Sequence, residues 1–263
     1  MHESIFNLLG WLPDIAILAI AAGAFGLLGG LIAFFSHRVW FRRWVQRAPH
    51  EEKLADTAHT SLLGFAAFVL ALSVTDAFSV LSKVEDSVRL EALEIARLDR
   101  ELDAQGAAGE AARRALAAYV RDVAREEWPS LGRTPSALSP RVRQHLDDVW
   151  KGVRAVQHGL GEDYKNVRDD MSAYLTTIER YRASRLAAAT NNIPAVFWGI
   201  IGLFGIAASF LSGRDQPSRY GTQINMIQMS AIGLVVGLIV VLNNPFRGET
   251  SVSPAIMIEA LKR

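Results

Sequence analysis

Four long apolar runs constrain the fold of this chain more than any other feature. They cover residues 15–35, 61–81, 193–211 and 223–242. Each run is about 20 residues long, which is the length a helix needs to cross ~30 Å of hydrocarbon at ~1.5 Å per residue. Residues 82–192, between the second and third runs, are instead rich in charged side chains. The sequence therefore predicts an integral membrane protein whose spans are arranged as two plus two.

The charged middle segment has helical periodicity. Apolar residues such as Val84, Val88 and Leu98 recur among the charges, and neither Pro nor Gly separates them from the second apolar run. This pattern predicts one helix that crosses the membrane and continues to about Gln105. Further helices are predicted over 111–128, ended by Pro129, over 140–160 with a cap at 139, and over 162–181. Their apolar stripes need partners, so we expect a helical bundle outside the bilayer.

The expected fold class is thus all-α, with four transmembrane helices and an extramembrane helical bundle inserted between the second and third spans. This divides the chain into 1–81, the first two spans with their basic loop; 82–192, the bundle; 193–242, the last two spans; and 243–263, a C-terminal tail. Asn192 and Pro194 predict a break where the chain enters the third span.

Composition excludes several function classes. The 28 basic and 27 acidic residues leave a net charge of +1, so no overall field attracts nucleic acid. The absence of cysteine excludes disulfides, iron–sulfur clusters and cysteine-ligated zinc. The carboxylate pairs Glu91 with Glu94 and Glu126 with Glu127 lack a histidine at metal-ligand spacing, and we expect them to be solvated. No phosphate-binding loop, nucleophile elbow or dinucleotide fingerprint is present, so neither a cofactor nor enzymatic activity is expected.

The loop between the first two spans predicts a membrane-interface anchor. Trp40 and Trp44 alternate there with Arg42 and Arg43, a pattern typical of a short amphipathic helix at the headgroup level. A lipid-binding site is the alternative interpretation of the same residues.

The arginines of this loop also predict an orientation. By the positive-inside rule the loop is cytoplasmic, which places the bundle and both termini on the outer side of the membrane. Cations that flank the bundle, among them Lys83, Arg89 and Arg180, favour the opposite orientation. Labelling of a reporter near Thr134 before and after permeabilisation distinguishes the two.

Glycines within the spans predict close helix contacts, because packing rather than hydrophobicity drives helix association in lipid. They recur at helical spacing in the first, third and fourth runs: Gly23, Gly26, Gly29 and Gly30; Gly199, Gly202 and Gly205; and Gly233 and Gly237.

Polar residues within two of the runs are candidates for lining a pore. Asp76 is the one ionisable residue in an apolar core, and Ser73 and Ser79 lie three positions to either side of it. A carboxylate in lipid needs a protein partner or water, so these three side chains are predicted to line a wet path. The alternative is that Asp76 lies at the interface or is hydrogen-bonded. Asn225 and Gln228 in the fourth run either contact permeating ions or bridge helices.

Segments 62–81, 119–129, 192–198 and 244–254 together resemble the bestrophin-like domain family of bacterial membrane proteins. Examples are the entry to the third span with Phe197 and Trp198, and the Pro245-Phe246 pair that follows the last span. The resemblance covers residues from about 54 to 254. The chain departs from the family where Asn243 and Asn244 replace an acidic and a basic residue before Pro245.

The resemblance implies a function. Bestrophins are oligomeric ion channels with four spans per subunit, of which the second lines the pore, and with a helical domain in the cytosol. A relative would be a homo-oligomer in the lipid bilayer that passes inorganic ions passively, with Ser73, Asp76 and Ser79 around the path. The bestrophin topology would place the bundle in the cytosol, against the arginine-rich loop. A second hypothesis is a non-conducting scaffold or envelope sensor whose bundle binds a partner.

Overall fold

The computed structural model describes residues 12–42, 49–132, 139–190, 194–214 and 219–262. Nearly all of these residues are helical, and the described ranges contain no strand. Four segments are long and apolar enough to cross a membrane, judged by length and composition: Asp14–Phe41, Lys53–Ala104, Glu162–Ser212 and Tyr220–Leu242. The prediction of an all-helical chain with four long apolar helices is therefore confirmed.

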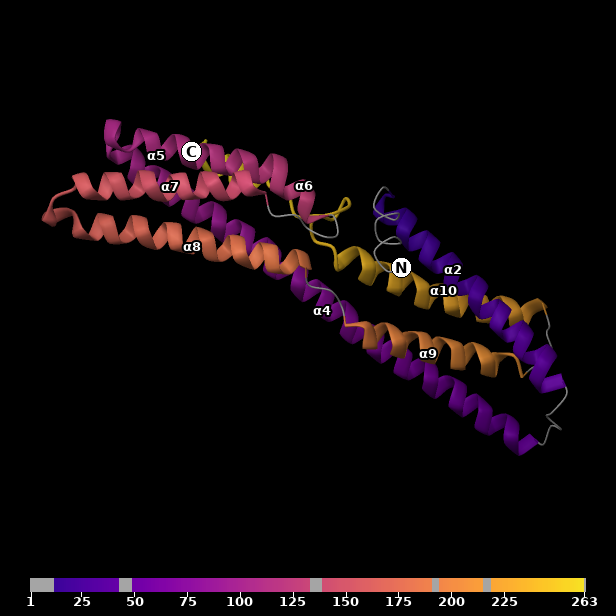
Figure 1. Ribbon diagram of the computed structural model, residues 1–263. Coiled ribbons are helices and arrows are strands. Elements are labelled where there is room, and N and C mark those ends of the chain that lie inside the picture. The colour runs from indigo at the N-terminus through magenta and orange to yellow at the C-terminus, as the bar shows by residue number, and fades with distance from the viewer. Residues whose placement is uncertain (1–11, 43–48, 133–138, 191–193, 215–218, 263) are drawn as a thin grey trace.

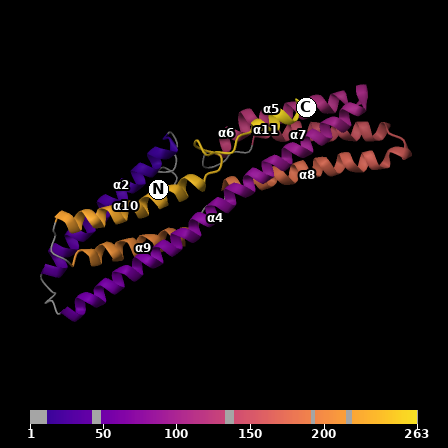
Figure 2. The same cartoon turned by 180° about the vertical axis from the view of Figure 1, so that it is seen from behind.

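Helix α4, Pro49–Ala104, is the longest element and has 56 residues. At ~1.5 Å per residue it is about 84 Å long, and Figures 1 and 2 show it running from one end of the molecule to the other. No Pro or Gly interrupts it after Gly64, and it ends just before Gly106, which has a φ of 56°. The predicted continuous helix to about Gln105 is confirmed.

At one end of the molecule, α9 (Ala195–Ser212) and α10 (Arg219–Leu242) pack on the first half of α4, and α2 (Asp14–Ser36) packs on α10 and α9 (Figure 1). Helices α2 and α10 approach closely through glycine: a Cβ added to Gly233 would lie 2.5 Å from the carbonyl oxygen of Ala21. Gly26 and Gly29 likewise face α10 side chains. Gly23 on α2 and the glycines on α9 have no such neighbour within 4 Å, so the predicted contact is wrong for them within the subunit: Gly23, Gly199, Gly202 and Gly205.

At the other end, α5 (Glu110–Asp122), α6 (Trp128–Leu131), α7 (Pro140–Gly159) and α8 (Lys165–Thr190) lie beside the second half of α4. The short α11 (Ala255–Ala260) packs on α4 in the same region (Figure 2). The apolar stripes of these helices meet in one core, which includes Val88, Leu98, Leu116, Val149 and Leu175.

Two helix boundaries test the local sequence signals. The Ser139 Oγ accepts the N–H of Val142 at 3.5 Å, and Pro140 follows it as the first helical residue, which confirms the predicted start of α7. The prediction that Pro129 ends its helix is wrong. Pro129 lies in the first turn of α6, after a π-helical turn over Val123–Glu127. A proline is tolerated there because the first helical turn has no N–H partner to lose.

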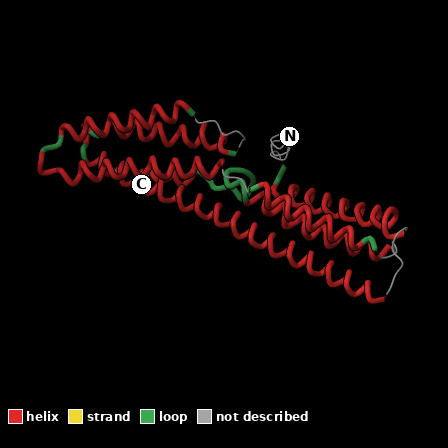
Figure 3. Tube along the Cα trace, turned by 60° about the horizontal axis from the view of Figure 1, so that its bottom comes forward, coloured by secondary structure: helices red, strands yellow, loops and turns green. Residues whose placement is uncertain are grey.

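The segment that follows α10 joins the two ends of the molecule (Figure 3). The Trp128 Nε1–H donates to the carbonyl oxygen of Val252 at 3.0 Å, and the Trp128 ring packs edge-on against Phe246 at 5.6 Å. The Thr250 N–H and Oγ–H both donate to Asp14 Oδ2 at 3.0 Å. Residues 245–252 therefore tie α6 of the bundle to the start of α2.

Candidate functional site

The outer side of α4 carries a row of small side chains. They recur every three or four residues, which places them on one side of the helix. We call this row the small-residue face of α4: Ser61, Gly64, Ala71, Thr75, Ser79 and Ser82. All but the half-buried Ser79 are exposed. Phe68, 63% exposed, is the bulky side chain within the row, and the exposed side chains of Phe65, Leu72 and Phe78 flank the row. The opposite side of α4, with Ala66, Leu70 and Ala77, is buried in the subunit.

The three residues predicted to line a wet path do not share one environment. Ser73 is buried, and its Oγ–H donates to the carbonyl oxygen of Val69 at 2.9 Å. Asp76 is exposed beside the small-residue face, and Ser79 belongs to that face. The structure thus brings Asp76 and Ser79 to the outside of the subunit, whereas Ser73 points inward. Thr75 was missed in the sequence, although the spacing of small residues along α4 indicates it.

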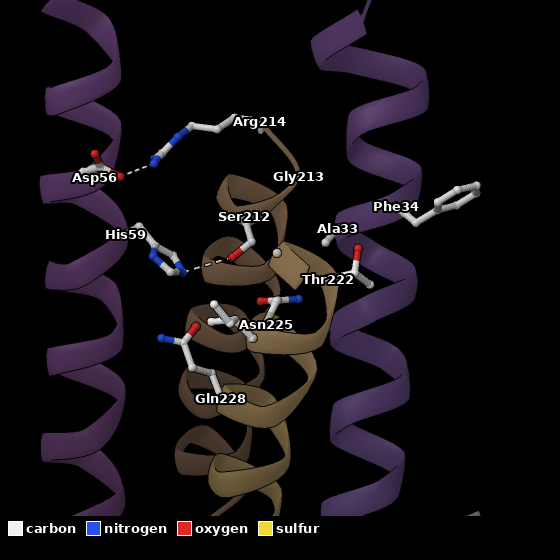
Figure 4. A pocket seen from close by; sticks show the side chains of 12 residues that line it. Ala33, Phe34, Asp56, His59, Ser212, Gly213, Arg214, Thr222, Asn225 and Gln228 are labelled. Atoms are coloured by element: carbon white, nitrogen blue, oxygen red, sulfur yellow. Dashed lines mark hydrogen bonds and ion pairs between the residues drawn. The ribbon is translucent and has the colours of Figure 1, made fainter. Parts of the chain in front are cut away.

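A cavity of about 260 Å³ lies between α2, α4, α9 and α10 at the end of the molecule opposite the bundle (Figure 4). At its rim the Asp56 carboxylate pairs with the Arg214 guanidinium. The His59 Nε2 is 3.1 Å from the Ser212 Oγ, whose own hydrogen is donated to the carbonyl oxygen of Ala208 at 3.1 Å. His59 is therefore the donor to Ser212, and these contacts join α4 to the end of α9.

The two amides predicted on the fourth span both line this cavity. The Asn225 Nδ2–H donates to the carbonyl oxygen of Gly29 at 2.9 Å, so this amide bridges α10 and α2. Its Oδ1 is buried and has no hydrogen-bond partner among the described residues. Figure 4 shows this oxygen on the side turned away from α2, above Gln228. The structure brings Asn225 and Gln228 together, but on an inner cavity rather than on the small-residue face of α4.

The predicted interface anchor lies at the same end as the cavity. Trp40, in a π-helical turn over His37–Phe41, is 54% exposed, and its ring lies 6.3 Å from that of Phe210. Arg42 is exposed as well. Arg43 and Trp44 lie outside the described residues.

Four charged side chains meet inside the bundle, and we call them the buried charge cluster. Arg185 binds Glu91 through Nε at 3.2 Å and Glu127 through Nη1 at 3.0 Å. Arg182 binds the other oxygen of Glu127 at 2.5 Å. The Tyr119 O–H donates to Glu91 at 2.9 Å, and burial, with Glu91 adding to it, raises the pKa of Tyr119 well above its usual value. Two carboxylates and two guanidiniums make the cluster neutral.

The expectation that Glu91 and Glu127 are solvated is wrong, because both side chains are fully buried. The signal was present in the sequence. Glu91 occupies a position of the apolar stripe on α4 that contains Val88 and Ile95, and Arg185 continues the stripe of α8 that contains Ile178. A charged residue at such a position must find an opposite charge or leave the core.

The remaining carboxylates of those pairs lie nearer the surface. Glu126 accepts hydrogen bonds from Arg141 at 2.7 Å and from Ser139 at 3.0 Å, and both lower the pKa of its carboxyl group. Glu94 pairs with Arg97 on the same helix but is buried, at 9% exposure, so the expectation of solvation is wrong for it as well. The described residues contain no group of His, Cys, Asp and Glu arranged to hold a metal ion.

Comparisons with known proteins agree on one family. A family model described as the Bestrophin-like domain matches residues 23–257. A bacterial Bestrophin homolog from Klebsiella pneumoniae has a TM-score of 0.63 at 15% sequence identity, covering 95% of this chain and 96% of that one. A variant of the Klebsiella pneumoniae homolog with one substitution has a TM-score of 0.63 at 14% identity over the same shares. No curated protein matches the sequence. At these identities the likeness to the solved structures shows a shared fold.

Proposed function

Because the chain belongs to the Bestrophin-like domain family, we propose that it is a subunit of a homo-oligomeric, passive ion channel in a bacterial inner membrane. The spans are α2, the first half of α4, α9 and α10, arranged as two plus two, and the bundle over 82–192 lies outside the bilayer. The small-residue face of α4 lines the pore, and inorganic ions flow down their electrochemical gradient.

The small-residue face of α4 is the observation that supports this proposal. Lipid-facing helices expose large apolar side chains, as α2 does with Leu27 and Leu31. A row of Ser, Gly, Ala and Thr instead offers hydroxyls and backbone to water or to a neighbouring helix. Asp76 beside it requires water or a protein partner, since lipid penalises an exposed carboxylate. A ring of subunits whose α4 faces surround a central pore gives both the small-residue face and Asp76 contact with water. Phe68 then forms an apolar constriction.

Thr75→Cys tests this arrangement, because the chain contains no natural cysteine. We expect purified protein in planar bilayers to conduct, and a water-soluble methanethiosulfonate reagent to reduce the Thr75→Cys current by more than half. A bulky adduct at this position narrows the path for every ion. Single-channel recording before and after the reagent measures the effect.

The matched control is Leu203→Cys, which lies on the exposed side of α9 and is 63% exposed. The reagent should leave its current unchanged. An equal block of both variants, or none in Thr75→Cys, contradicts a pore lined by α4. Silence at all voltages and salts would favour the alternative, a non-conducting scaffold or sensor whose bundle binds a partner.

Asp76 sets the charge preference of the proposed pore. One carboxylate attracts a cation about 4 Å away by about 1 kcal/mol in water, which corresponds to roughly a five-fold preference. Because the same carboxylate repels an anion by a similar energy, we expect Asp76→Asn to lower the cation-to-anion permeability ratio by about five-fold or more, measured from reversal potentials in a salt gradient. A ratio unchanged by Asp76→Asn removes this residue from the ion path.

Family membership also bears on orientation. Bestrophins hold their helical domain in the cytosol, and the cations at Lys83 and Arg89 favour the same side over the periplasmic placement that the arginine-rich loop predicts. We therefore place the bundle in the cytosol. A cysteine at the exposed Lys151 of α7 should react with a membrane-impermeant maleimide only after spheroplasts are permeabilised. Reaction in intact spheroplasts would restore the periplasmic placement.

A further inference from the structure

We propose that the cavity between α2, α4, α9 and α10 binds the headgroup of an aminophospholipid, a lipid with a phosphate and a primary ammonium. The inference rests on residence in a membrane and not on conduction. Its test therefore has an outcome that is independent of whether the protein conducts ions.

The cavity lies at the level of the predicted membrane interface, where lipid headgroups are found. It opens near the ends of α2 and α9, beside the exposed Trp40 of the predicted interface anchor. Two of its lining side chains are apolar and face outward, Phe34 at 47% exposure and Ile224 at 41%. Ile227 extends this apolar surface along α10. A ligand with a polar head in the cavity and acyl chains along α2 and α10 satisfies both parts of this surface.

The interior of the cavity requires a hydrogen-bond donor. Asn225 is 3% exposed, its Nδ2 is committed to the carbonyl oxygen of Gly29, and its Oδ1 has no partner among the described residues. A buried acceptor without a partner is unfavourable, so a ligand that donates to it gains affinity. The amide of Gln228 supplies a further acceptor oxygen in the same lining, and the Asp56 carboxylate at the rim has a second oxygen beside the one that pairs with Arg214. A primary ammonium carries three N–H donors for such a set.

The rim of the cavity suits a phosphate. Arg214 presents a planar fork of five donors, and its pairing with Asp56 holds the guanidinium at the cavity (Figure 4). His59 lies beside it and bonds Ser212, the last residue of α9. Guanidinium donors at the rim and amide oxygens inside match the phosphate and the ammonium of a phosphoethanolamine group. The volume of about 260 Å³ leaves room for a ligand well beyond one water molecule, whose share of liquid volume is ~30 Å³.

Choline and ethanolamine lipids test the ammonium, because both headgroups carry the same charges but only ethanolamine has N–H donors. We expect delipidated full-length protein in detergent to bind dioleoyl phosphatidylethanolamine roughly five-fold more tightly than dioleoyl phosphatidylcholine, measured by native mass spectrometry. Gln228→Leu should abolish this preference. Asp56→Asn, at the exposed rim, should reduce it, and because this change also removes the ion pair with Arg214, thermal melting of the variant is measured alongside.

The matched control is Gln223→Leu, which lies on the exposed side of α10 and does not line the cavity. It should keep the preference for ethanolamine. Equal binding of the choline and ethanolamine lipids, or tighter binding of phosphatidylglycerol than of either, overturns the proposal. So does thermal stabilisation by sodium or potassium chloride that matches the stabilisation by ethanolamine lipid, because the cavity then holds ions and water.

Discussion

Arg185→Met is expected to lower the free energy of unfolding by about 3–5 kcal/mol, since removing one partner of a buried ion pair leaves the other charge uncompensated. Without this guanidinium, Glu91 has no cationic partner and Glu127 keeps only Arg182. Both carboxylates are inaccessible to solvent, so water cannot replace the lost partner. Arg185 also lies over the ring of Trp128 at 5.0 Å, a cation–π contact that is lost with it. At 2–4 °C per kcal/mol for a chain of this size, Tm should fall by roughly 6–20 °C in a detergent melting experiment.

Two companion variants separate the buried charge from a general loss of packing. Arg180→Met removes an exposed arginine from the same helix and should change Tm little. Combining Arg185→Met with Glu91→Leu and Tyr119→Phe leaves the neutral pair of Glu127 and Arg182. This triple variant should recover much of the loss, because apolar residues replace a buried ion pair at little cost. A single Arg185→Met that melts like Arg180→Met would contradict the account.

Gly233→Leu is expected to disrupt the packing of α2 on α10. A Cβ at this position would lie 2.5 Å from the carbonyl oxygen of Ala21 and 2.7 Å from the Cβ of Phe25. Both are poorly movable atoms, so the helices must separate along their contact. We expect a loss of roughly 3 kcal/mol or more, at the upper end of overpacking effects. Circular dichroism melting and size-exclusion chromatography in detergent measure it.

Gly23→Leu is the matched control, since Gly23 lies on α2 two residues from Ala21 but has nothing within 4 Å of its added Cβ. It should melt close to the unsubstituted protein. If both variants melt alike, the effect comes from the leucine in a membrane helix and not from the close contact between α2 and α10.

The fold could be predicted in large part because its main signals are local. The apolar runs and the absence of Gly or Pro after Gly64 define α4, and Ser139 with Pro140 defines the start of α7. Pro129 was misjudged because a π-helical turn precedes it and moves it into the first turn of a new helix. No local pattern of the sequence indicates such a turn, although Glu127, its last residue, is held by Arg182 and Arg185 of α8.

The candidate sites were less predictable because they depend on contacts between distant segments. Glu91 and Arg185 are 94 residues apart, so their pairing is visible only in the folded bundle. Asn225 could be identified as a bridging amide, but its partner is the backbone carbonyl of Gly29, which has no sequence signature. The burial of Ser73 and the exposure of Asp76 could not be predicted for the same reason. Neighbouring turns of one helix face different surroundings once α9 and α10 cover one side of α4.

The length of α4 gives it the geometry of a lever. The buried charge cluster contacts α4 through Glu91, whereas Thr75 and Phe68 lie further along the same continuous helix. At ~1.5 Å per residue, Phe68 is about 35 Å from Glu91. A tilt of α4 by roughly 3° at Glu91 therefore displaces Phe68 sideways by about 2 Å. A displacement of that size is comparable to the radius of a small bare ion. In the channel proposed above, the bundle is therefore placed to change the pore radius at Phe68 without any helix melting or bending.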